Sequence, residues 1–271
     1  MNWVKIGLAL ILFVTSALLA HVITKKLQKR RTAYPVAFIL FVFGLSILSR
    51  QFLLPAINSW KYQRDIDRSL LDISAYQQIA NYDTKAYQEI KAEILDSIKK
   101  GENPTQAIGR GRKKIGALVT RYIPHASDEA IVRYMIAMIQ EIEELANKDP
   151  DLCYQFLFPD RYGSPGSTKY FKPDTQRADL NALADVIRTA AEQPQPEPDK
   201  TQGEALLKKV MSSFYEAHGE EAQLLRDPFA PGIDKGKVCN LIAELYREAL
   251  KLPQKDRGLL LRYILSAKKS S

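Results

Sequence analysis

Hydrophobic positions divide the chain into two regions with different patterns. Residues 6–23 carry no full charge, and residues 35–54 are almost as apolar, with Arg50 near their far end. Both runs are apolar on every side of a helix, which suits lipid better than a protein surface. Eighteen helical residues span about 27 Å, close to the hydrocarbon thickness of a bilayer. The pattern predicts a two-helix transmembrane hairpin, and the amphipathic repeats that follow it predict a multi-helix soluble domain.

The segment between the two apolar runs is short and basic. It holds five cations within seven residues: Lys25, Lys26, Lys29, Arg30 and Arg31. Because such a segment is hard to translocate, we expect it in the cytoplasm and the soluble domain on the other side of the membrane. Bases beside the outer ends of the runs weaken this asymmetry, so a cytoplasm-facing domain stays open. A cleaved signal peptide is a further alternative, for which the first run offers only a poor cleavage site.

Turn residues and prolines divide the chain beyond the hairpin at 1–60. We expect a stalk helix at 61–82, a larger helical domain at 83–192, a linker at 193–200 and a C-terminal helical piece at 201–271. The linker reads QPQPEPDK, and its alternating prolines favour an extended chain. Helix N-caps are expected at Asp83, Ser127 and Asp174. Since no stretch has the pattern of a strand, the fold class expected is all-α, with the soluble domain in two pieces.

The net positive charge of the chain is concentrated in the predicted membrane region. The chain has 39 bases and 31 acids, and residues 1–60 contain seven of the bases and no acid. The remainder is therefore close to neutral, which argues against a nucleic-acid partner because such binding needs a basic face. The partners expected are the lipid bilayer and another envelope protein, and the oligomeric state is left open.

The two cysteines, Cys153 and Cys239, are candidates for a disulfide. They would pair in an oxidising compartment and remain buried thiols in the cytoplasm. Together with three scattered histidines they have no metal-ligand spacing, so no metal site is expected. No cofactor is expected either, because the basic run at 109–114 lacks the spacing and the Ser/Thr of a P-loop.

Two groups of residues are candidates for binding. One lies in and beside an irregular loop at 160–173, where aromatic side chains either anchor a partner or fold back onto the core: Tyr162, Tyr170 and Phe171. The other is a basic run that is either a solvated helix face or a patch for anionic headgroups or an acidic protein: Arg110, Arg112, Lys113 and Lys114.

Evidence for catalysis is limited to two histidines. His125 stands next to Ser127 and Asp128 at a helix start, and His218 precedes Gly219. Each could serve as a general base with a nearby acid, but no nucleophile or metal motif accompanies either one. Structural roles at helix ends therefore explain them better.

The sequence as a whole favours a binding protein over an enzyme. We expect a two-span inner-membrane protein with an extracytoplasmic helical domain, acting as an assembly factor, an inhibitor or immunity-type protein, or a subunit of an envelope complex. Its contact surface would be the 159–173 loop or a groove between the two helical pieces. The alternatives are a membrane-anchored hydrolase using His125 or His218, and a cytoplasm-facing protein with a basic lipid- or protein-binding patch.

Overall fold

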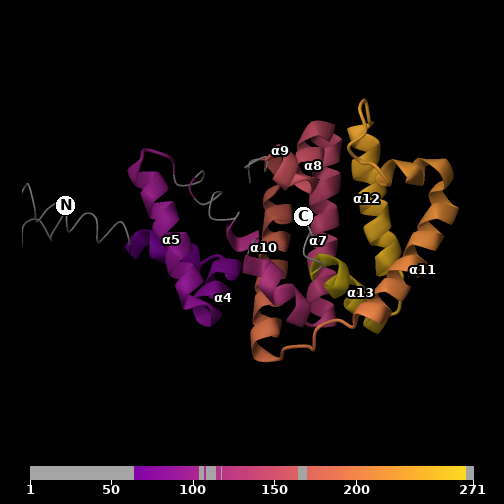
Figure 1. The fold of residues 1–271 in the computed structure, drawn as a ribbon. Helices are drawn as coiled ribbons and strands as arrows, with labels where there is room; N and C mark the ends of the chain where they lie inside the picture. The colour runs from indigo at the N-terminus through magenta and orange to yellow at the C-terminus, as the bar shows by residue number, and fades with distance from the viewer. Residues whose placement is uncertain (1–63, 104–106, 108–113, 117, 164–169, 267–271) are drawn as a thin grey trace, which may run out of the picture. The chain divides into compact units, whose positions relative to one another are not determined.

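The computed structural model describes residues 64–266, apart from 104–106, 108–113, 117 and 164–169. The predicted transmembrane hairpin at 1–60 and the basic loop within it lie outside these residues. Asp67 to Ser271 belong to one compact unit. Throughout the part that is described, every regular element is a helix and there is no strand, which confirms the predicted all-α class (Figure 1). No helix there combines the length and the apolar composition needed to cross a bilayer.

Nine α-helices and two 3-10 helices have described bounds. In chain order they are α4 (Ser74–Tyr82), α5 (Thr84–Lys99), η2 (Ile123–His125), α7 (Asp128–Lys148), α8 (Pro150–Leu157), α9 (Pro159–Tyr162), α10 (Pro173–Glu192), α11 (Lys200–His218), η4 (Gly219–Leu225), α12 (Lys235–Leu250) and α13 (Gln254–Ser266). Described residues between 107 and 122 are also helical.

Helix α7 is the centre of this unit. Ser127 caps it, since its hydroxyl accepts a hydrogen bond from the backbone N–H of Ala130 at 3.2 Å, and acids occupy its first turn. α7 packs against α8, α10, α12 and α13, so helices from both sides of the proline-rich segment at 193–200 meet on it. Its buried side chains recur at helical spacing and form much of the core: Ala130, Ile131, Met135, Ile139, Ile142 and Leu145.

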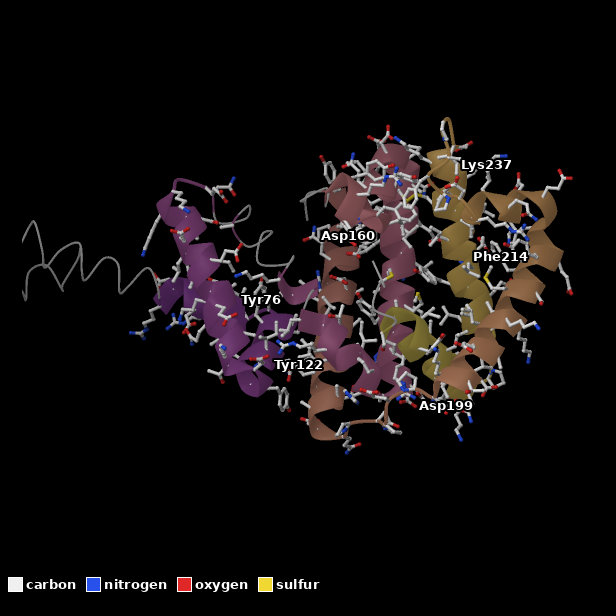
Figure 2. The ribbon with its side chains drawn as sticks, in the orientation of Figure 1. Tyr76, Tyr122, Asp160, Asp199, Phe214 and Lys237 are labelled. Carbon is white, nitrogen blue, oxygen red and sulfur yellow. A yellow bond between two sulfur atoms is a disulfide. The ribbon has the colours of Figure 1, made fainter. Side chains whose placement is uncertain are left out.

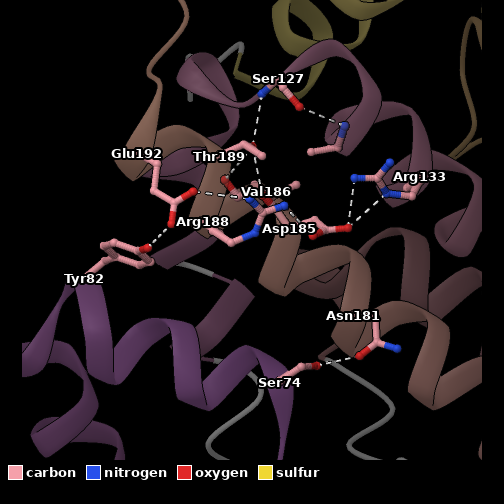
Figure 3. A network of polar contacts seen from close by, with 11 residues as sticks. Ser74, Tyr82, Ser127, Arg133, Asn181, Asp185, Val186, Arg188, Thr189 and Glu192 are labelled. Carbon is pink, nitrogen blue, oxygen red and sulfur yellow. Dashed lines mark hydrogen bonds and ion pairs between the residues drawn. The ribbon is translucent and has the colours of Figure 1, made fainter.

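Polar contacts join α4, α7 and α10 (Figure 3). Asp185 of α10 binds Arg133 of α7 at 2.9 Å and Arg188 of its own helix at 3.0 Å. About two turns further along α10, Glu192 pairs with Arg188 and accepts a hydrogen bond from the hydroxyl of Tyr82 at the end of α4. α4 also packs against α10, and Tyr76 of α4 is buried, with 1% exposure.

The chain before α4 differs from the single stalk helix expected at 61–82. Residues 67–71 are helical, and a turn at 72–73 then separates them from α4. Ile73 adopts extended backbone (φ −94°, ψ 120°), so the helical hydrogen bonding does not continue through it.

Helices α12 and α13 pack on α7, and α11 packs on both of them. Phe214 of α11 is fully buried with Ala222 and Leu241, and Figure 2 shows it between α11 and α12. Two glycines allow close approach of α13. A Cβ at Gly258 would lie 2.3 Å from Asp128, and a Cβ at Gly203 of α11 would lie 2.4 Å from the Tyr263 ring.

A buried ion pair fixes the contact between α13 and the start of α7. Arg262 is 6% exposed, pairs with Asp128 at 3.1 Å and donates to the carbonyl of Ala126 at 3.1 Å. Burial raises the pKa of Asp128, and the opposing charge of Arg262 limits that rise.

The proline-rich segment between α10 and α11 has no helix at residues 194–199. Gln195 exchanges two hydrogen bonds with His125, because its N–H donates to the His125 carbonyl and its carbonyl accepts from the ring Nδ1, each at 2.9 Å. A carbonyl can only accept, so His125 carries a proton on Nδ1. Both sides of the segment belong to the same compact unit.

Candidate protein-binding surface

Four aromatic rings meet where α8 and α9 lie beside the turn that precedes α12. We call Tyr154, Phe158, Tyr162 and Phe229 the aromatic platform. Ring centroids are 4.9 Å apart for Tyr154–Phe158, 5.2 Å for Tyr154–Tyr162 and 4.9 Å for Phe158–Phe229. The rings are tilted or edge-to-face, which is the arrangement that aromatic quadrupoles favour.

The first half of the platform is built by two short helices. Asp149 caps α8 by accepting from the Asp151 N–H at 2.8 Å, and Pro150 occupies the first helical position, where no N–H is needed. Pro159 starts α9 in the same way, and Gly163 ends it at φ 76°, a conformation that favours glycine. The interrupted helix places Tyr154, Phe158 and Tyr162 around one point.

The second half is the turn at 227–232. The Asp227 carboxylate accepts a hydrogen bond from the Phe229 N–H at 3.2 Å, and Gly232 completes the turn at φ 76°. Asp234 then caps α12 by accepting from the Lys237 N–H at 3.0 Å. These local bonds present the Phe229 ring to α8.

The two halves are far apart in sequence and are held together by three kinds of contact. A disulfide joins Cys153 to Cys239, with Cα atoms 6.4 Å apart and both residues fully buried, so of the two alternatives left open by the sequence the structure supports the paired one. The Tyr154 hydroxyl donates to the carbonyl of Pro228 at 2.5 Å. Lys235 forms an ion pair with Asp151. The platform therefore depends on a covalent contact directly behind it.

Tyr154 is the buried base of the platform, with 2% exposure. Burial is the larger cause and the neighbouring Tyr162 phenol the smaller one, and together they raise the pKa of Tyr154 to about 12. The phenol is neutral at physiological pH, so it remains able to donate to Pro228.

The outer edge of the platform is open to solvent and carries a cation. Tyr162 is 44% exposed and Phe229 is 36% exposed. The guanidinium carbon of Arg161 lies 4.3 Å from the centroid of the Phe229 ring and 5.8 Å from that of Tyr162, within cation–π range. Exposed aromatic rings beside an arginine have the composition of protein-binding hot spots.

The three aromatic residues expected to bind occupy different places. Tyr162 belongs to the platform. Phe171 is 8% exposed and folds back onto the domain, where its ring lies 6.0 Å from that of Phe156. Tyr170 is half-buried, and its carbonyl accepts a hydrogen bond from Lys148.

Of the basic run, only Lys114 is among the described residues; Arg110, Arg112 and Lys113 lie outside them. Lys114 pairs with Glu93 of α5 at 2.6 Å, and that hydrogen bond raises the pKa of Lys114. The described part of the run is thus paired within the domain.

Both histidines that were considered as general bases in the alternative enzyme reading make structural contacts. His125 binds the Gln195 carbonyl, and the His218 ring packs 4.5 Å from the Phe214 ring. Among the described residues, neither ring hydrogen-bonds to a hydroxyl, a thiol or a carboxylate. Within the same residues, no group of three His, Cys, Asp or Glu side chains is placed to hold a metal ion.

Two shallow hollows are also present. One, of about 270 Å³, lies between α7 and α12, which belong to the two helical pieces of the sequence analysis, and is lined by Glu143, Asn147, Asn240, Ala243, Glu244 and Arg247. Arg247 pairs with both Glu143 and Glu244, so the charges of this groove compensate one another. The other, of about 480 Å³, lies on α11 and is lined by Ala205, Lys208, Lys209, Ser212, Ser213 and Glu216. Neither offers an exposed aromatic side chain.

The sequence analysis did not single out Tyr154, Phe158, Arg161 or Phe229. Their local signals exist, because the first three fall in a proline-interrupted aromatic stretch and Phe229 falls in a Pro/Gly turn. What the sequence does not show is that these segments meet.

Comparison with known proteins gives no relative: no family model, no curated protein and no solved structure matches this chain.

Proposed function

We propose that the helical domain binds another envelope protein through the aromatic platform, outside the cytoplasm, and that an N-terminal hairpin tethers it to the inner membrane. The observation that carries the proposal is the partly exposed platform itself, with Tyr162, Phe229 and Arg161 at its edge. Aromatic side chains and arginine contribute a large share of binding energy in protein interfaces.

The disulfide supports the location. Such bonds persist in oxidising compartments and are rare in the cytoplasm. The Cys153–Cys239 pair is fully buried behind the platform, as expected of a bond that holds structure. The cationic loop in the hairpin independently favours the same side of the membrane.

A photo-crosslinking residue placed at position 162 in the native host tests the contact. We expect an adduct with one envelope protein, and we expect Phe229→Ala to diminish it because the neighbouring ring is lost. The matched control is the same crosslinker at Ile136, an exposed apolar position of α7 (43% exposed). Equal labelling at both positions would exclude the platform as the contact surface.

Labelling from each side of the membrane tests the location. Ser212→Cys introduces an exposed thiol on α11, and both native cysteines are disulfide-bonded and buried. A membrane-impermeant maleimide added to intact spheroplasts should label this variant. Labelling only after lysis would place the domain in the cytoplasm.

A further inference from the structure

Arg161, at the edge of the platform, has no carboxylate partner among the described residues. Its guanidinium lies over Phe229 and beside Tyr162, its side chain is exposed, and it forms no ion pair with a described residue. Stacking on a ring uses the flat face of a guanidinium and leaves its in-plane N–H donors for other partners.

The other charges around the platform are already engaged. Lys235 pairs with Asp151, and Asp149 caps α8. Asp227 accepts from the backbone of its own turn, and Asp160 also has a partner. Among the described residues around the platform, Arg161 is therefore the cation that pairs with no carboxylate.

We propose that the platform accepts a segment of a partner protein in which a carboxylate side chain stands next to an aromatic or apolar side chain. Arg161 binds the carboxylate through its fork of N–H groups, and the neighbouring apolar side chain covers Tyr162 and Phe229. Covering these rings removes water from the ion pair, which strengthens it. This inference rests on the proposed function and specifies the chemistry of the partner.

Two synthetic peptides that differ only in charge provide the test. They are the dodecapeptides (Gly-Glu-Phe)₄ and (Gly-Gln-Phe)₄, measured by surface plasmon resonance on captured full-length protein in a neutral detergent. A charge-assisted hydrogen bond contributes enough for a preference of about tenfold for the glutamate peptide.

Variants assign that preference to one side chain. Arg161→Gln should reduce this preference to near unity, and Arg161→Lys should retain only part of it because lysine lacks the fork. The matched control is Arg177→Gln on α10, which removes another exposed surface guanidinium, paired with Asp174, and should change neither peptide's binding. Circular dichroism and a non-reducing gel check that each variant is folded and oxidised.

The outcomes separate this inference from the proposed function. Equal binding of both peptides, or a glutamate preference that survives Arg161→Gln, overturns the inference. If Tyr162→Ala and Phe229→Ala still weaken both peptides in that case, the platform remains a binding surface. Absence of binding for both peptides up to about 1 mM also overturns the inference, and the crosslinking at position 162 then decides the proposed function alone.

Discussion

Removal of the Cys153–Cys239 disulfide should be the largest single perturbation of this domain. The cysteines are 86 residues apart in sequence, so the bond closes a long loop in the unfolded chain. In the chain-entropy model a loop of this length corresponds to about 4.6 kcal/mol of stability at 25 °C. Because domains of this size have a total stability of about 5–15 kcal/mol, much of the margin depends on one bond.

The double variant Cys153→Ala/Cys239→Ala isolates this effect, since it leaves no unpaired thiol. Urea unfolding of the full-length protein, followed by pulse proteolysis, measures it. With an m-value of about 2 kcal/mol/M, the midpoint should fall by about 2 M. Reduced wild-type protein should show the same midpoint as the double variant.

The structure also predicts where the loss appears first. The turn at 227–232 is held against α8 by the disulfide, the Tyr154–Pro228 hydrogen bond and the Lys235–Asp151 pair. Amide hydrogen exchange in this turn should accelerate more than exchange in α10, which the bond does not touch. An unchanged urea midpoint in the double variant, compared with wild type that is shown to be oxidised, would refute the reasoning. Uniform acceleration of exchange across the domain would also refute it.

Glycine substitutions, an arginine substitution and a pH series test the packing around α13. Gly258→Ala and Gly203→Ala should each destabilise the folded domain by about 1–3 kcal/mol through overpacking. Gly116→Ala is the control, because a Cβ there meets nothing within 4 Å, and it should stabilise the domain by about 0.5–1 kcal/mol. Urea midpoints compare the three variants. Arg262→Met should cost about 3 kcal/mol because it leaves Asp128 without its ion-pair partner, and a loss no larger than that of Arg177→Met would contradict this. Burial raises the pKa of Asp128 in the folded protein above its ordinary value of 3.8. The resulting contribution of Asp128 to folding stability is therefore fully present below pH 3.8, and it is lost as the pH rises through the folded-state pKa. Urea midpoints measured from pH 3.5 upward, in steps of about half a pH unit, should show this decline in wild type and not in Asp128→Asn. The control is Asp174→Asn, an exposed position, which should show the same decline as wild type.

Local features of the fold could be read from the sequence because their causes are local. Ser127 and Asp83 cap helices as expected, since a capping side chain bonds to a backbone N–H only three residues away. The expected cap at Asp174 is wrong. Pro173 takes the first position of α10 and Lys172 precedes it, because proline tolerates that position better than any interior one. The break at Ile73 carries neither glycine nor proline, so the helical pattern ran through it unmarked.

The binding surface could be predicted only in part. Tyr162 was recognised from its place beside a Gly/Pro loop, yet the same argument also selected Phe171, which is buried. Periodicity cannot separate the two, because their exposure depends on which distant ring packs against them. Phe229 reaches the platform from 67 positions beyond Tyr162, and the cysteines were the only sequence signal that linked these regions.

The central place of α7 has a consequence for how the chain is made. Its apolar surface is shared between α8 and α10, which follow soon, and α12 and α13, which lie much further along the chain. During synthesis, the part of that surface that α12 and α13 cover therefore stays exposed until both helices have emerged. A truncation or a frameshift that removes α12 and α13 should leave a half-domain with an exposed apolar face, which aggregates or is degraded.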